Sequence, residues 1–151
     1  MISSHARKEL AAIMVGKRLG VGVYRKVYVN RFDPTTVIKI EENGKGFCNV
    51  KEWEVWEAFV DTAPTRKFLA PCRFISPCGT ILIQDRTWPI MAEDLPKKIP
   101  SFINGDLKSE NWGWLKYGKP GKMVRRPVCH DYGGFLIGDP LRLVKADWSR
   151  G

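Results

Sequence analysis

The chain has 151 residues and a mass of 17.2 kDa, which is room for one compact domain. Its hydrophobic content of 44% and charged content of 27% exclude a disordered, collagen-like or repeat protein. Lys and Arg number 25 against 16 Asp and Glu, and the resulting net charge of +9 favours anionic partners such as nucleotides, nucleic acid or acidic proteins.

The first half is predicted to fold as two helices and an antiparallel set of strands. Ser3 and Ser4 are candidate caps of a short first helix. A second helix is expected from about Asn49 to Val60, with Asn49 as its N-cap and Glu52 at the capping-box position. Segments rich in Val, Ile and Tyr, bounded by turn residues, predict strands. The expected strands are 21–29, 37–40, 72–76 and 80–84.

The second half has a weaker helix signal because Pro89, Pro96 and Pro100 interrupt every long periodic segment there. Two further strands are predicted at 111–117 and 123–129, around a turn rich in glycine and proline. This order of elements predicts an α+β fold with mainly antiparallel sheets.

Cysteine spacing and apolar runs indicate the compartment. The four cysteines form no C-x-x-C pair, so we expect buried, reduced thiols and not a disulfide scaffold or a zinc site. The longest apolar run near the N-terminus, Leu10–Val15, is too short for a signal peptide or a membrane span. We therefore expect a cytoplasmic protein without membrane contacts.

Two segments of the first half carry candidate chemistry. Gly20 and Gly22 lie around the start of the expected strand 21–29, where glycines allow a hairpin backbone to approach phosphates closely, although glycines are also ordinary in hairpin turns. Lys39 lies within an apolar strand, and a buried ammonium needs an anion. Glu52 shares a helix face with apolar residues and is the candidate partner. The alternative is that Lys39 reaches solvent from the strand end.

Two segments of the second half carry carboxylates. Asp106, Lys108 and Asn111 can converge in a tight loop and supply a base, a cation for phosphate and a metal ligand. Asp131 follows a predicted strand and precedes Tyr132 and a glycine, and its carboxylate is a candidate magnesium ligand.

Taken in order, these motifs resemble the signature of the protein kinases. The matching residues are Gly20, Gly22, Val27, Lys39, Glu52, Asp106, Lys108, Asn111, Asp131, Tyr132 and Gly133. The small size resembles compact kinase-like proteins of bacteriophages. The resemblance implies one kinase-like domain over residues 1–151. It implies an antiparallel N-lobe at about 1–88 with one αC-type helix, and a reduced C-lobe at 89–151.

The resemblance also implies ATP and Mg²⁺ as cofactors and a role for each residue. Lys39, paired with Glu52, would hold the α and β phosphates. Asp106 would orient or deprotonate the acceptor hydroxyl, and Lys108 would steady the transferred phosphoryl group. The implied metal ligands are Asn111 and Asp131. The implied nucleotide-binding residues are Gly20, Gly22, Arg25, Val27, Lys39, Gln84 and Asp85.

The sequence departs from the kinase pattern at several points. Arg25 replaces the third glycine, where it would either reach a phosphate or block one. Asn104-Gly105 replaces the His-Arg before the catalytic Asp and is closer to the His-Gly-Asp of small-molecule kinases. Only 20 residues follow Asp131, so we expect no activation segment and no peptide-binding helices.

Three functional hypotheses follow. The first is an ATP- and Mg-dependent phosphotransferase resembling a minimal Ser/Thr protein kinase, in the host cytoplasm if a phage encodes it. The second is a catalytically weak pseudokinase that binds a host or partner protein. The third is a basic nucleic-acid-binding protein. Basic residues between Lys116 and Arg126 form either a solvated face or a docking patch for an acidic partner.

The reduced C-lobe carries a further expectation about partners. Apolar residues around the catalytic loop have few predicted elements to cover them, so we expect an exposed apolar patch that a homodimer or a host protein covers. The residues expected in this patch are Phe102, Ile103, Leu107 and residues 135–137.

Overall fold

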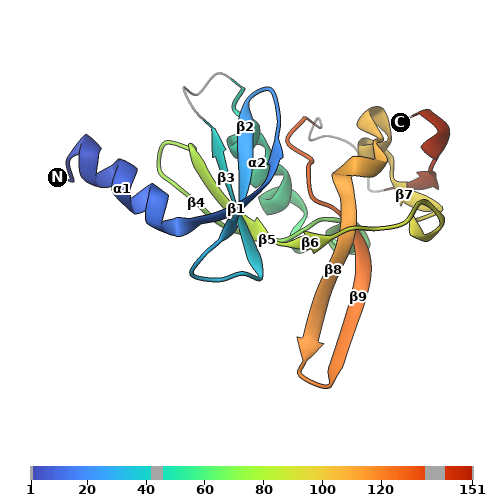
Figure 1. Cartoon of the computed structure of the whole chain (residues 1–151). Coiled ribbons are helices and arrows are strands. Elements are labelled where there is room, and N and C mark those ends of the chain that lie inside the picture. The colour runs from blue at the N-terminus through green and yellow to red at the C-terminus, as the bar shows by residue number, and fades with distance from the viewer. Residues whose placement is uncertain (1, 42–45, 135–141, 151) are drawn as a thin grey trace.

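The computed structural model describes residues 2–41, 46–134 and 142–150. In this part the chain is an α+β protein with antiparallel sheets and two α-helices (Figure 1). The expected α+β class is therefore confirmed. Residues 135–137, expected in the apolar patch, lie outside the described part. No helix among the described residues is long and apolar enough to cross a membrane.

Helix α1 (Ser4–Met14) precedes the main sheet and extends away from it (Figure 1). The backbone N–H of Ala6 donates to Ser3 Oγ at 3.1 Å, so Ser3 caps the helix as predicted. None of the residues of α1 is buried.

Five antiparallel strands form the main sheet in the order β1-β2-β3-β5-β4. Their bounds are Val15–Val21 (β1), Arg25–Asn30 (β2), Thr36–Glu41 (β3), Cys72–Ile75 (β4) and Ile81–Asp85 (β5). The prediction of one strand over 21–29 was wrong for residues 22–24, which separate β1 from β2. β1 ends at Val21, and a turn follows in which the N–H of Gly22 donates to the carbonyl of Arg25 at 2.8 Å.

Helix α2 (Cys48–Phe59) follows β3 along the chain and contacts β3, β4 and β5. The prediction that Asn49 caps it was wrong, because α2 begins one residue earlier. The Asn49 side chain contacts β3 instead, and its amide donates to the carbonyl of Lys39 at 3.1 Å. The carboxylate of Glu41 accepts the Asn49 backbone N–H, so an acidic group from β3 serves the helix N-terminus. The capping-box position of Glu52 is likewise wrong, since its carboxylate faces cations of the sheet.

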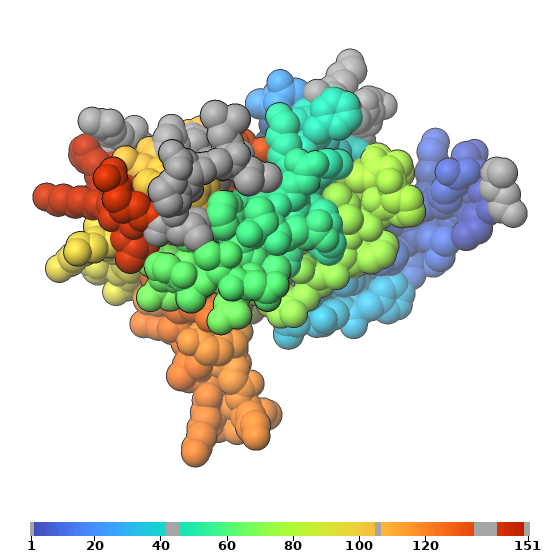
Figure 2. Space-filling model, turned by 180° about the vertical axis from the view of Figure 1, so that it is seen from behind, coloured from blue at the N-terminus to red at the C-terminus, as the bar shows by residue number. Residues whose placement is uncertain are grey.

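A second sheet contains β6 (Thr87–Trp88), β8 (Trp112–Lys119) and β9 (Lys122–Cys129). The β8–β9 hairpin projects away from the rest of the chain (Figures 1 and 2). Gly118 and Gly121 hold positive φ angles of 116° and 81° at its tip, a conformation that favours glycine. A third sheet pairs β7 (Lys98–Pro100) with β10 (Leu143–Lys145). The 3-10 helices are Thr65–Phe68, Ala92–Asp94, Ser101–Asp106, Ser109–Asn111 and Trp148–Arg150.

One apolar core joins α2, the main sheet and the second half of the chain. The expectation of an exposed apolar patch that includes Phe102, Ile103 and Leu107 was wrong for these three residues. Ile103 and Leu107 are buried, and Phe102 stacks on Phe59 with ring centroids 5.0 Å apart. The reason is that residues 142–150 return over this region, where Trp148 packs edge-on against Trp112 at 5.5 Å. The expected homodimer stays a prediction.

All four cysteines are free thiols, as expected, but only Cys72 and Cys129 are buried. Cys48 is partly buried and Cys78 is exposed at the β4–β5 turn, so the expectation of four buried thiols was too broad.

Candidate functional site

Lys39 and Glu52 form a buried ion pair between β3 and α2. Lys39 Nζ lies 2.5 Å from Glu52 Oε1, and the two residues are 3% and 0% exposed. Side chains alternate along β3, so Lys39 and Glu41 face α2. Glu52 lies on the buried face of α2 together with Val55 and Phe59. The contact expected from the sequence is therefore present.

Arg25 at the start of β2 joins the same cluster. Its guanidinium pairs with Glu52 through Nη2 and contacts Asp131 Oδ1 at 2.9 Å. Its second terminal nitrogen donates to Asn49 Oδ1 at 3.1 Å. We call Arg25, Lys39, Glu52 and Asp131 the ion-pair network. Two cations and two carboxylates leave the network without net charge.

Asp131 follows the end of the β8–β9 hairpin, which positions it in this network. Trp112 and Cys129 pair across the base of the hairpin, so Asn111 and His130 are neighbours just beyond it. The His130 N–H donates to the Asn111 carbonyl at 2.8 Å, and the His130 carbonyl accepts from Lys39 Nζ. The two residues predicted as metal ligands, Asn111 and Asp131, are thus held at the same end of one hairpin.

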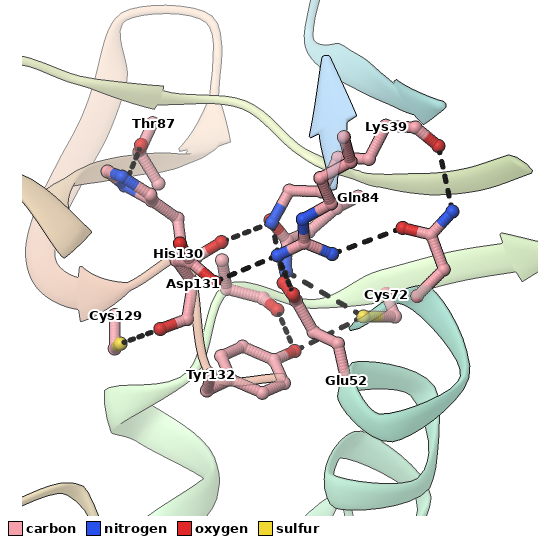
Figure 3. A network of polar contacts seen from close by, with 12 residues as sticks. Lys39, Glu52, Cys72, Gln84, Thr87, Cys129, His130, Asp131 and Tyr132 are labelled. Carbon is pink, nitrogen blue, oxygen red and sulfur yellow. Dashed lines mark hydrogen bonds and ion pairs between the residues drawn. The ribbon is translucent and has the colours of Figure 1, made fainter. Parts of the chain in front are cut away.

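The His130 side chain has a structural role in this arrangement. Its Nε2 donates to the carbonyl of Glu110 at 3.0 Å, since a carbonyl only accepts. In the neutral ring Nδ1 therefore accepts from the Thr87 hydroxyl at 2.7 Å (Figure 3). Burial and the nearby Lys39 cation lower the pKa of His130 from its usual 6.5 to about 4. His130 consequently stays neutral near pH 7.

Burial and neighbouring charge act in opposite directions on the buried pair. Burial, followed by repulsion from Arg25, lowers the pKa of Lys39, although Glu52 and Asp131 oppose this change. For Glu52, burial raises the pKa, but the attraction of Arg25 and Lys39 outweighs it and the net pKa lies below 4.5. Because Arg25 also contacts Glu52, the carboxylate stays ionised even when Lys39 engages another anion.

Gln84 and Asp85 of β5, both predicted to bind nucleotide, have protein partners in this structure. The Gln84 side chain faces inward and donates to Glu52 Oε1 at 2.7 Å, which makes it a positioning residue for the pair. Asp85 forms a bidentate ion pair with Arg73, at 2.7 and 2.6 Å. The alternation of β5 explains the inward direction of Gln84, because Leu82 on the same face is also buried.

Tyr132 and Cys72 lie on either side of the Glu52 side chain and contact each other near the segment that carries Asp131 (Figure 3). The Tyr132 hydroxyl donates to the carbonyl of Ala70 at 2.7 Å and lies 3.2 Å from Cys72 Sγ. Burial raises the pKa of the Cys72 thiol to about 12, so this cysteine is a packing group and not a nucleophile.

Gly20 lies in β1, and Gly22 lies in the turn between β1 and β2. Neither Gly20 nor Gly22 has a positive φ angle among the described glycines. A Cβ on Gly20 would meet open space, and one on Gly22 would make an ordinary contact of 3.5 Å with the Arg25 carbonyl. The backbone itself therefore does not require these glycines. Val27 lies on β2, where it pairs with Lys39 across the sheet.

Asp106 and Lys108 lie on the segment between β7 and β8. Asp106 is the last residue of the 3-10 helix Ser101–Asp106, and its side chain is outside the description. Lys108 is exposed and precedes the helical turn Ser109–Asn111. Among the side chains described, no group of three His, Cys, Asp or Glu is placed to hold a metal ion.

Sequence reasoning named Arg25, Asn49 and Gln84 in other roles, but it missed the contacts by which they join this site. The interior role of Arg25, the amide bonds of Asn49 and the contact from Gln84 depend on which residues the sheet and α2 bring together. One available signal was the placement of Arg25 at the first residue of a strand directly after a glycine turn. Comparison of the chain with models of known protein families and with curated proteins found no match.

Proposed function

We propose that the protein is a nucleotide-dependent phosphotransferase of the protein-kinase type, with Mg-ATP as donor and a protein Ser/Thr hydroxyl as acceptor. One observation carries the proposal: β3, α2 and the end of β9 bring Lys39, Glu52 and Asp131 into one network. These segments carry three motifs far apart in the sequence. If the match of these short motifs to the kinase pattern were accidental, nothing would require their residues to lie together in the fold.

The donor capacity of Lys39 supports a role in binding phosphate. An ammonium has three donors, and two of them engage Glu52 and the His130 carbonyl. The third is left for a phosphate oxygen. Gln84 and Arg25 hold Glu52 from other sides, so Glu52 keeps Lys39 in position when the phosphate binds. The open space beside Gly20 leaves room for a phosphate chain near β1.

The donor groups near the end of β9 fit magnesium. The Asp131 side chain is 52% exposed and is a carboxylate, and Asn111 beside it offers an amide oxygen. When bound, magnesium neutralises the phosphate charge that develops during transfer. Arg25 contacts the Oδ1 atom of Asp131, and this ion pair competes with a metal ion for the carboxylate.

Asp106 is assigned the acceptor side of the reaction by its place in the motif. In this role its carboxylate would take the proton of the acceptor hydroxyl as that oxygen bonds to the terminal phosphorus, whose bond to the bridging oxygen breaks and releases ADP. Lys108, exposed three residues before Asn111, is assigned to the transferred phosphoryl group.

A second candidate function is a binding module without catalysis. Arg25 favours it, because its guanidinium already occupies the carboxylates that the phosphotransferase needs. In such a module the ion-pair network stays intact, and the surface of the protein binds a partner protein.

Transfer of labelled phosphate from ATP separates the two candidates. The purified protein is incubated with γ-labelled ATP, magnesium and a mixture of acceptor proteins. The phosphotransferase predicts label on protein Ser or Thr, lost in Asp131→Asn and in Asp106→Ala and retained in Asp61→Asn, an exposed control. Asp106→Ala should still bind the nucleotide, since it acts on the acceptor. Equal labelling in all variants, or none in the wild type, contradicts the proposal.

A further inference from the structure

The β8–β9 hairpin concentrates the positive charge of the chain. Residues 112–129, which we call the basic hairpin, contain five Lys or Arg and no Asp or Glu. They therefore supply five of the nine net positive charges in 18 residues. Among the described residues, no carboxylate forms an ion pair with any of these cations. The cations are Lys116, Lys119, Lys122, Arg125 and Arg126.

The basic hairpin projects clear of the main sheet and the core (Figures 1 and 2). Its base, up to Leu115 and from Val128, is buried, whereas residues 116–125 are exposed. A two-stranded ribbon is marginally stable by itself, and residues directly opposite each other interact. Here Lys116 faces Arg125 and Lys119 faces Lys122, so like charges repel across the ribbon. An anion between or beside them would relieve this repulsion.

The cations lie on both faces of the ribbon. Directly paired residues share a face, and faces alternate along each strand. Lys116 and Arg125 therefore lie on one face. Lys119, Lys122 and Arg126 lie on the other. A protein partner docked on this ribbon would cover one face and leave the other charged. In a groove, phosphates flank both edges of the ribbon, where the long Lys and Arg side chains of both faces can reach them.

Aromatic rings hold several of these cations in place. Arg125 lies over the Trp114 ring at 4.1 Å, and Arg126 lies over the Tyr117 ring at 5.0 Å. Lys116 and Arg86 both lie over the Trp88 ring, at 4.4 and 4.0 Å. These contacts lower the entropy lost when the side chains bind an anion. They also cover the rings, which favours phosphate contacts over the stacking of unpaired bases.

We infer that the basic hairpin binds double-stranded DNA by lying in its major groove and contacting phosphates on both sides. Strands of a ribbon are about 4.8 Å apart, and the B-form major groove is about 12 Å wide and accepts such a ribbon. The major groove of duplex RNA is deep and narrow and excludes it. The contacts are to the backbone, so binding is independent of base sequence. This inference is independent of the phosphotransferase proposal.

Fluorescence anisotropy with a labelled 24-base-pair DNA of mixed sequence tests the inference. Five phosphate contacts predict that log K falls against log salt with a slope of about −4.5. The variant Lys116→Gln/Arg125→Gln/Arg126→Gln removes three cations and should lower the slope to about −1.8. It also removes one facing pair of like charges, so its melting temperature should not fall by more than a few degrees.

The matched control is Arg7→Gln/Lys8→Gln/Lys17→Gln, which removes the same charge from exposed positions on α1 and β1. This control should keep the wild-type slope. An equal loss in both triple variants would overturn the inference, because net charge alone would then explain binding. Tighter binding to duplex RNA, to single-stranded DNA or to a poly-glutamate peptide than to duplex DNA at the same salt would also overturn it. The last result would assign the hairpin to an acidic protein.

Discussion

The guanidinium of Arg25 lies 2.9 Å from Asp131 Oδ1, although 106 positions separate the two residues in the sequence. This contact closes the ion-pair network, because Arg25 also pairs with the Glu52 carboxylate that holds Lys39. Arg25 stands at a position where the kinase pattern has a glycine. It therefore puts a positive charge beside Asp131, the candidate metal ligand. The predictions below test the consequences.

Arg25→Gln should increase the dependence of ATP binding on magnesium. The substitution releases Asp131 from its cation, so the carboxylate becomes available to a divalent ion. Calorimetric titration of ATP with and without magnesium measures the ratio of the two affinities, which should rise at least several-fold over wild type. Arg73→Gln breaks another Arg–Asp pair on the sheet surface and should leave this ratio unchanged. A ratio that is the same in Arg25→Gln and wild type would contradict the competition between Arg25 and magnesium for Asp131.

Glu52→Gln should destabilise the protein strongly. The change leaves two buried cations, Lys39 and Arg25, without the carboxylate between them. Removing one partner from a buried ion pair costs about 3–5 kcal/mol. Urea denaturation gives the free energy of unfolding. Glu57→Gln, exposed on the same helix, is the control and should change it by no more than about 0.5 kcal/mol. Similar values for the two variants would mean that Glu52 is not a structural anchor.

Gly20→Ala should leave stability nearly unchanged and weaken nucleotide binding. A Cβ at this position meets no protein atom within 4 Å, so folding does not select the glycine. A phosphate chain that passes close to β1 would meet the added methyl group. The melting temperature and the Mg-ATP affinity are measured on the same sample. Unchanged affinity would place the phosphates away from β1.

Lowering the pH from 6.5 to 4 should destabilise the protein through His130. Its pKa is about 4 in the folded protein and near 6.5 in the unfolded chain, so the unfolded state binds more protons in this window. Protonation therefore favours unfolding by up to about 3 kcal/mol. His130→Gln should flatten the decline of stability between pH 6.5 and 4, whereas His5→Gln on the exposed α1 should retain it. A wild-type slope in His130→Gln would assign the decline to carboxylates.

Parts of this structure follow directly from local sequence. The strands around Lys39 and the basic hairpin have clear alternation and turn glycines, and they form close to their expected bounds. The contact between Lys39 and Glu52 was predictable because burying a lysine in a strand demands an anion, and α2 offers one on its apolar face.

Other parts depend on tertiary contacts that local pattern does not encode. Arg25 enters the interior only because Glu52 and Asp131, both distant in sequence, supply two carboxylates at its strand end. The covering of Ile103 and Leu107 depends on Trp148 and its neighbours, a short segment without helix or strand periodicity. In the same way, Asn49 has the composition of a helix cap, but β3 provides competing partners for its side chain.

Calorimetric titration of Mg-ATP into wild type and Lys39→Met tests most directly the claim that the ion-pair network is a nucleotide site. Lys51→Met removes an exposed lysine from α2 and is the matched control. The account predicts saturable binding to wild type and to Lys51→Met, with an affinity at least tenfold lower in a folded Lys39→Met. No binding to the wild type, or equal affinity in all three proteins, would contradict it.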